Sequence, residues 1–440
     1  MLRILRRFVD FDRFVDCAPL LSVRHRDRAY RIISVCLILT FGIFSASAYA
    51  KNNEDIISRW NDLALAVIYN ARMQNFSEMA FAITLMNVAI FDSINSIERR
   101  YDAYALMESV EPSASKEAAA TEAAFTVLSA LFQSQISIIA NEKSSQLSEV
   151  PDGYGKTIGM SLGEKVARRL LIDRRDGLDT PPDAWRPETP VGMYIPTARL
   201  VTSYLGNSRP WLLKRGDQFR PPSPPLLTSL EFARDYDEVR IMGRRVSNER
   251  SKAQSFSARF WTMSGVHVWN RALNQALQYR SLTLSEHARV RALLNMAVAD
   301  SYIAAWDAKF AYGFWRPVTA IRSGDRVEGA KLSREAAWRP LIETPLHPDY
   351  PSGHSANAGA AVAVLESVFG DAPLGSLSII SDDFPQAVLT FKSFEELKEN
   401  ITNARIYGGI HFRFSCVAGE KLGREVGGFG VENYLRQIHR

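Results

Sequence analysis

The chain has 440 residues, of which 46% are hydrophobic and 23% charged, and its formal net charge at pH 7 is +5. This composition is typical of a globular protein and excludes a disordered, fibrous or disulfide-rich miniature protein. Eight of the 53 basic and four of the 48 acidic residues lie in residues 1–50, which leaves 45 basic and 44 acidic residues in the remainder. Because that remainder is nearly neutral, we expect no nucleic-acid partner.

Residues 1–50 have the three-part layout of a secretory signal peptide. An Arg-rich start precedes the apolar residues 32–44, and Ala48-Tyr49-Ala50 forms an A-x-A-type cleavage site. This mainly apolar segment of thirteen residues is short for a membrane span. We expect export to the periplasm or the medium, with no stable membrane insertion after cleavage. An uncleaved anchor is the alternative, because the stretch before the apolar residues is long for a signal.

The mature chain is expected to fold without disulfide bonds. Of the three cysteines, Cys17 and Cys36 belong to the leader, and only Cys416 lies in the body. No run of 18 uninterrupted apolar residues follows the leader, which disfavours a polytopic membrane enzyme.

Helical periodicity covers most of the body. Apolar residues recur at three-and-four spacing from residue 56 to about residue 171, and alternating β-branched runs are rare. The same spacing returns after residue 229, over residues 232–245, 268–279 and 285–309. We therefore predict an all-α fold with a helical-bundle core, in which residues 51–440 form one domain.

Residues 176–225 interrupt this pattern with ten of the 20 prolines, so the segment is not expected to be helical. It also carries large aromatic residues such as Trp185, Tyr194 and Trp211. A polar, Gly/Ser-rich composition is typical of flexible linkers. We interpret the segment as a long, ordered, Pro-rich loop on the helical body, with a flexible linker as the alternative.

Two cations near the end of one predicted helix form the first candidate site. Lys309 and Arg316 are seven residues apart, so two helical turns would place both on one face of a helix that Pro317 terminates. Solvated basic faces are common, but neighbouring aromatic residues, Trp315 among them, favour cations that need a charged partner.

A helix start follows in the sequence. Residues 356–365 are small and apolar, so a helix is expected to begin near Ser352. Its unpaired N–H groups, the Ser352 hydroxyl and Gly353 are suited to an oxyanion, beside which His354 would act as an acid or base. A plain N-cap with an incidental histidine is the alternative. Further on, Arg405 and His411 lie six positions apart and flank Gly408-Gly409.

The order of these segments resembles the vanadium-dependent haloperoxidases, which share a helical scaffold and anion site with the type 2 phosphatidic acid phosphatases. The matching motifs lie within residues 300–420: Lys309 to Arg316-Pro317, then Pro351-Ser352-Gly353-His354, then Arg405 to His411. Phe314-Trp315 and His347-Pro348 resemble the bacterial haloperoxidase-like branch. The likeness covers most of residues 56–430.

The resemblance implies vanadate as the cofactor, with His411 as its protein ligand and His354 as the acid-base residue. It also implies a set of groups that hold the vanadate oxygens: Lys309, Arg316, Ser352, the Gly353 N–H and Arg405. Bound vanadate would act as a Lewis acid while hydrogen peroxide oxidises a halide to hypohalous acid. His347 and Trp315 are implied in the substrate pocket, and His347 favours bromide or iodide over chloride.

Two positions depart from the family pattern. Ala404 replaces the usual serine before the arginine, and Ser415 stands where an acidic residue often follows the histidine. The second departure predicts the loss of an orienting charge near His411. Two other functions stay open: a secreted acid phosphatase that cleaves a phosphate ester through a phosphohistidine at His411, and a catalytically weakened oxyanion-binding protein. An oligomer is equally open.

Overall fold

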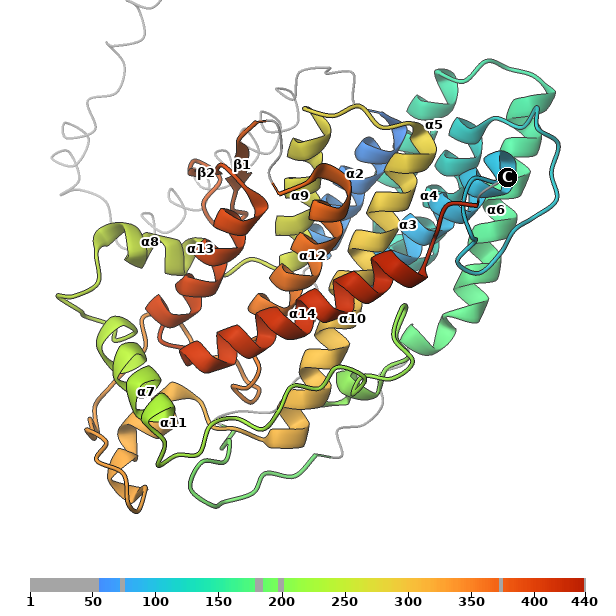
Figure 1. Ribbon diagram of the computed structural model, residues 1–440. Helices are drawn as coiled ribbons and strands as arrows, with labels where there is room; N and C mark the ends of the chain where they lie inside the picture. The colour runs from blue at the N-terminus through green and yellow to red at the C-terminus, as the bar shows by residue number, and fades with distance from the viewer. Residues whose placement is uncertain (1–54, 72–75, 179–184, 197–201, 372–374, 439–440) are drawn as a thin grey trace, which may run out of the picture. The chain divides into compact units, whose positions relative to one another are not determined.

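The computed structural model describes residues 55–71, 76–178, 185–196, 202–371 and 375–438. These belong to one compact unit, Asp55–Arg440. The predicted signal peptide lies outside the described residues, so its cleavage stays a prediction. The described chain is helical, with one two-stranded sheet (Figure 1). The predicted all-α bundle is therefore confirmed, with the small sheet as an addition.

The helices run in the following order, interrupted by short 3-10 turns and by the sheet. They are α2 (Ile56–Asn70), α3 (Phe76–Glu98), α4 (Lys116–Leu131), η3 (Gln133–Gln135), α5 (Ile136–Ser148), α6 (Tyr154–Asp173), η4 (Arg175–Leu178), η5 (Ser203–Asn207), α7 (Leu230–Met242), α8 (Lys252–Phe260), α9 (Gly265–Leu277), α10 (Leu284–Tyr312), α11 (Pro317–Arg322), η6 (Gly324–Arg326), α12 (Gly353–Phe369), β1 (Leu377–Ile380), β2 (Val388–Phe391), α13 (Phe394–Tyr407) and α14 (Arg413–Asn433).

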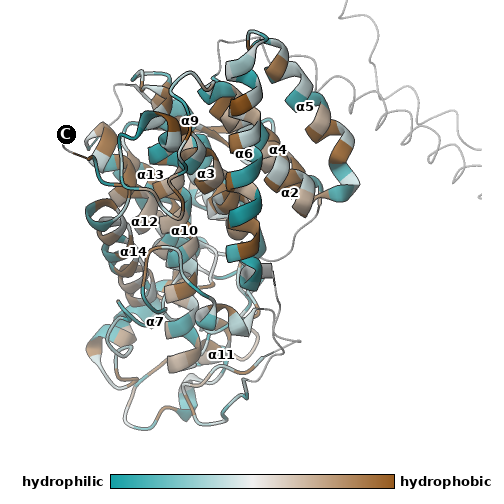
Figure 2. Cartoon of the chain, turned by 90° about the vertical axis from the view of Figure 1, so that its right-hand side faces the viewer, coloured by the Kyte–Doolittle hydropathy of each residue, from teal (hydrophilic) through white to brown (hydrophobic). Residues whose placement is uncertain are grey.

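Helices α3 and α10 lie at the centre of the main hydrophobic core. Among the described helices, α3 is long and apolar enough to span a membrane, but 94% of its apolar window is buried inside the protein. The pair α4 and Gln133–Ser148 meets the same criterion only as a single span, bent by 118°. The burial of α3 is typical of a core helix. In contrast, hydrophilic residues recur along α5 and α6 in Figure 2.

The described parts of the Pro-rich segment are ordered against the helices. The Tyr194 N–H donates to Gly313 O at 2.6 Å, and the Trp211 N–H donates to an Asp300 carboxylate oxygen at 2.7 Å. The Arg174 guanidinium lies 3.9 Å from the centre of the Trp211 ring. These contacts agree with an ordered loop and argue against a flexible linker in the described parts.

One sequence-based expectation about α10 is wrong. The helix ends at Tyr312, because Gly313 adopts the left-handed conformation with φ 55° and caps it. Arg316 lies beyond the helix in extended backbone, and Pro317 begins α11 instead of terminating α10. Lys309 and Arg316 therefore do not share a helix face. Helix α8 and the β1–β2 hairpin were also not anticipated.

Helices α12 and α14 are packed closely side by side (Figure 1). A Cβ atom at Gly423 of α14 would collide with the carbonyl oxygen of Ala356, and one at Gly359 of α12 would collide with that of Glu420. Glycine therefore permits the approach of the two backbones. This packing brings the start of α12, after Ser352, next to the start of α14, after His411: the Ser352 N–H donates to Ser415 O at 2.9 Å.

Candidate functional site

Five of the predicted site residues line one cavity of about 220 Å³. They reach it from the loop before α12, the start of α12, the end of α13 and the loop before α14. These five are His347, Gly353, His354, Arg405 and His411. The other lining residues are Phe76, Thr262, Tyr302, Trp306, Ile342, Glu343, Pro345 and Ile410. The fold thus gathers residues that are far apart in the sequence, as the motif order predicts.

Arg405 is the buried cation of this cavity. It lies in the last turn of α13, its side chain is 1% exposed, and its Nε and Nη2 atoms have no hydrogen-bond partner. Burial lowers its pKa to about 10, so the group is still charged at neutral pH. An unpaired buried charge lowers the stability of the fold unless a counter-ion neutralises it. The cavity therefore favours an anion at Arg405.

His354 lies in the first turn of α12, beside this guanidinium. Its burial and the positive charge of Arg405 lower its pKa to about 3, so the imidazole is neutral at physiological pH. Its Nε2 lies 3.3 Å from the carbonyl oxygen of Met263, which assigns the hydrogen to Nε2 and the lone pair to Nδ1. Nδ1 is therefore the nitrogen at which His354 would accept a proton, and at a pKa of about 3 it is a weak base.

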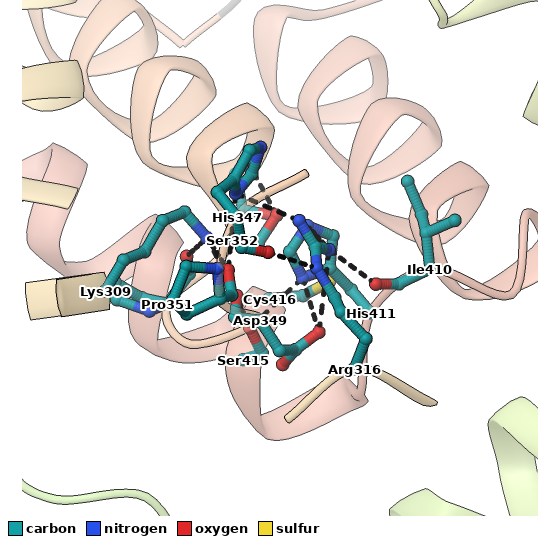
Figure 3. Close-up of polar contacts among 12 residues, drawn as sticks. Lys309, Arg316, His347, Asp349, Pro351, Ser352, Ile410, His411, Ser415 and Cys416 are labelled. Atoms are coloured by element: carbon teal, nitrogen blue, oxygen red, sulfur yellow. Dashed lines mark hydrogen bonds and ion pairs between the residues drawn. The ribbon is translucent and has the colours of Figure 1, made fainter. Parts of the chain in front are cut away.

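Arg316 contacts two of the histidines that line the cavity (Figure 3). Its Nη1 lies 3.1 Å from His411 Nε2, and its Nη2 lies 3.0 Å from His347 Nδ1. A guanidinium can only donate, so each of these ring nitrogens is an acceptor without hydrogen. Burial, followed by the charges of Arg316 and Lys309, holds the pKa values of both His347 and His411 well below the usual range. His411 is therefore neutral and carries its hydrogen on Nδ1.

Lys309 is directed at the backbone rather than at the cavity. Its Nζ donates to the carbonyl oxygens of Pro348, Asp349 and Pro351 at 2.9, 2.9 and 2.6 Å. All three ammonium protons are thus used by the loop before α12. Burial and the nearby Arg316 charge hold the pKa of Lys309 well below its usual range. In this structure Lys309 shapes the loop that carries the site.

Ser352 is the N-cap of α12, as the sequence predicts: its hydroxyl accepts from the N–H of Ser355 at 3.4 Å. The side chain of Ser352 is fully buried. The first N–H groups of α12, starting with Gly353, thereby begin at the cavity, where a helix N-terminus favours negative charge.

Asp349 is the site residue that sequence reasoning missed. Its Oδ1 lies 2.9 Å from His411 Nδ1 and 3.8 Å from Arg316 Nη1, and the residue is fully buried. Neither carboxylate oxygen has a hydrogen bond of good geometry. Burial raises the pKa of Asp349 to about 7. Its place in the sequence, between His347 and the Pro-Ser-Gly-His motif, was the available signal. Position 415 carries no carboxylate, but Asp349 places one next to His411.

Trp315, predicted in the substrate pocket, does not line this cavity. It stacks on Phe232, at 6.4 Å between ring centres, inside a second hydrophobic cluster. Trp306 of α10 lines the cavity instead, and its ring centre lies 4.7 Å from that of His347. A larger hollow of about 580 Å³ adjoins the cavity through the shared residues Phe76 and Thr262.

The donor set suits an oxyanion better than a cation. Within the described residues, no three His, Cys, Asp or Glu side chains converge as a metal-cation site. The cavity instead offers the unpaired guanidinium of Arg405, the start of α12 and two neutral histidines, while Glu343 at its lining is exposed. These residues fit a tetrahedral oxyanion such as vanadate or phosphate.

Comparison with known proteins agrees with this site. Residues 289–440, which carry the charged and histidine residues of the site, match the family model of the VCPO second helical-bundle domain. Residues 289–440 are thus similar in sequence to a domain of the vanadium haloperoxidases. Vanadium chloroperoxidase from Curvularia inaequalis is 23% identical to this haloperoxidase-like chain over 231 residues, and the match covers 46% of this chain and 37% of that enzyme. Vanadium-dependent bromoperoxidase from Ascophyllum nodosum is 33% identical over 96 residues, which are 19% of this chain and 17% of that enzyme.

Solved structures show the same fold over most of the haloperoxidase-like chain. A bacterial vanadium-dependent iodoperoxidase superposes with a TM-score of 0.71 at 23% identity, covering 88% of this chain and 97% of that one. A holo-type bacterial vanadium-dependent chloroperoxidase gives a TM-score of 0.63 at 16% identity, covering 81% and 91% of the two chains. The sequence matches thus span less than half of the length of the curated relatives. The superpositions, in contrast, cover most of this chain and most of each solved structure.

Proposed function

We propose that this chain is a vanadate-dependent haloperoxidase, which oxidises bromide or iodide with hydrogen peroxide to hypohalous acid. The observation that carries the proposal is the buried, unpartnered guanidinium of Arg405 in a cavity that it shares with His354 and His411. Such a cation needs an anion. The likeness of residues 289–440 to the vanadium haloperoxidases favours vanadate as that anion.

Different residues would bind the vanadium atom and its oxygens. The Nε2 lone pair of His411 would bind the vanadium atom, while Arg405 and the N–H groups at the start of α12 would hold its oxygens. Lys309 and Arg316 would add positive charge, and Arg316, which donates to His411 Nε2 in this structure, would turn from that nitrogen toward a bound oxygen. When bound, vanadate supplies a Lewis acid that makes hydrogen peroxide more electrophilic.

His354 would take up the proton of hydrogen peroxide. Its Nδ1 is the unprotonated nitrogen, and with a pKa of about 3 the ring is a weak base in the anion-free protein. A bound anion would offset the Arg405 charge that contributes to this low pKa. We therefore expect anion binding to raise the pKa of His354 toward the range in which a histidine can both accept and return a proton.

The cavity walls favour a soft, weakly hydrated halide. Phe76, Trp306 and the His347 ring enclose the space next to the anion site. Burying bromide or iodide among such groups costs less hydration free energy than burying chloride. The iodoperoxidase with the same fold supports this preference. We also propose that the protein acts outside the cytoplasm, after loss of residues 1–50.

One vanadate titration separates this function from the acid phosphatase that the same residues could form. In the anion-free protein, added orthovanadate should switch on halogenation of an organic acceptor in the presence of hydrogen peroxide and bromide or iodide. In a phosphatase, the same vanadate would inhibit hydrolysis of p-nitrophenyl phosphate, because it mimics the transition state. Phosphate hydrolysis that vanadate abolishes, without halogenation at any vanadate concentration, would reject the peroxidase. Vanadate binding without either activity would indicate the catalytically weakened oxyanion-binding protein.

A further inference from the structure

We propose that Asp349 is the positioning residue of His411: its carboxylate keeps the imidazole hydrogen on Nδ1 and the lone pair on Nε2, the nitrogen to which Arg316 donates in this structure. The inference rests on the proposed function only in taking Nε2 as the nitrogen that binds the anion. It assigns to residue 349 the orienting charge that the sequence pattern would place at residue 415.

The two edges of the His411 ring face opposite partners. On one edge, Nδ1 lies 2.9 Å from Asp349 Oδ1; on the other, Nε2 lies 3.1 Å from the Arg316 guanidinium. The carboxylate can accept a hydrogen, and the guanidinium cannot. The charges at the two edges therefore favour the same tautomer, although the Nδ1–Oδ1 contact is an ion pair by distance and not a hydrogen bond of good geometry. Since His411 and Asp349 are at most 2% exposed, water does not compete for either contact.

Asp349 is held in place through its backbone. Its N–H donates to Phe314 O at 2.9 Å, and its carbonyl accepts from Lys309 Nζ at 2.9 Å and from Ser415 Oγ at 3.1 Å. Lys309 and Ser415 thus fix the backbone of the loop that carries the Asp349 carboxylate. This gives Lys309 a role in the site that does not require contact with the anion.

Ser415 cannot supply the charge itself. Its Oγ lies 3.3 Å from His411 Nδ1, a longer contact than that of Asp349, and a hydroxyl accepts a hydrogen more weakly than a carboxylate. Carboxylates that orient a ligating histidine raise its basicity, and their loss typically lowers ligand affinity about 10- to 100-fold. Asp349 has the carboxyl group, the distance and the burial for this role.

The test uses the full-length anion-free protein and the variant Asp349→Asn. The ¹⁵N chemical shifts of the His411 ring should show Nδ1–H in the parent and a mixture of the Nδ1–H and Nε2–H tautomers in the variant, because the amide can donate as well as accept and only the Arg316 contact then still favours Nδ1–H. Orthovanadate titration should show an affinity lower by about 10- to 100-fold. Adding Ser415→Asp to this variant should restore both readouts, since it returns a carboxylate to the same edge of the ring.

Asp300→Asn is the matched control. Asp300 is also fully buried, but its carboxylate accepts from the N–H groups of Trp211, Leu212 and Leu213, away from the cavity. Its substitution should change thermal stability and leave the His411 tautomer and the vanadate affinity unaltered.

The outcomes separate this inference from the proposed function. A parent His411 with its hydrogen on Nε2 overturns the assignment whether or not any variant folds. An unchanged tautomer in folded Asp349→Asn overturns it as well. If the tautomer shifts but the parent binds no vanadate, the positioning role stands and the proposed cofactor is wrong.

Discussion

Replacing Arg405 by methionine should weaken orthovanadate binding without lowering the stability of the anion-free protein. The guanidinium is 1% exposed, and two of its nitrogens lack a partner. A bound oxyanion would supply charge-assisted hydrogen bonds worth about 1.5–3 kcal/mol each. Because Arg405→Met removes the whole guanidinium, and the loss of one such bond already corresponds to about 10-fold or more, orthovanadate binding should weaken by at least about 10-fold. In the anion-free protein, the same substitution removes an unpaired buried charge, so the unfolding free energy should not fall.

The assay pairs orthovanadate titration with chemical unfolding in the absence of vanadate. Arg174→Met is the matched control, because Arg174 is also buried but donates to the carbonyl oxygens of Pro210 and Arg209 at 2.9 and 2.8 Å and packs on Trp211. That variant should lose about 2–4 kcal/mol of stability and keep the parent's vanadate affinity. If Arg405→Met were as unstable as Arg174→Met and bound vanadate normally, the guanidinium would be a structural group and our reasoning would be refuted.

Three further predictions concern the histidines, a helix end and the leader. His411→Ala should abolish vanadate binding together with activity, whereas His354→Ala should keep the anion bound and slow turnover by about 100-fold or more; the reverse pattern in a vanadate titration would exchange their roles. Gly313→Ala should cost about 1 kcal/mol or more in unfolding free energy, because φ is 55° and a Cβ would lie 2.8 Å from Met193 Cε; a variant as stable as the parent would show that this helix end adapts freely. Exported protein should begin at Lys51, and N-terminal sequencing that still finds residues 32–44 would indicate an uncleaved anchor.

Short-range features of this protein could be predicted from its sequence. Ser352 was expected at the start of a helix and caps α12, and helical spacing anticipated α3 and α10. Capping and periodicity depend on residues within a few positions of each other, so the local sequence contains their causes. The grouping of His354, Arg405 and His411 in one cavity followed from the resemblance of their motifs to a known family, not from spacing alone.

The partners of the charged side chains were decided only by the tertiary structure. Lys309 was expected to hold an anion, but packing of the loop before α12 places three carbonyl oxygens around its ammonium group. Gly313 ends α10 early and separates Arg316 from it. Asp349 reaches His411 because close packing of α12 and α14 brings their N-terminal loops together. A buried charge takes the partner that the fold brings within hydrogen-bonding distance, and that distance depends on segments far apart in the sequence.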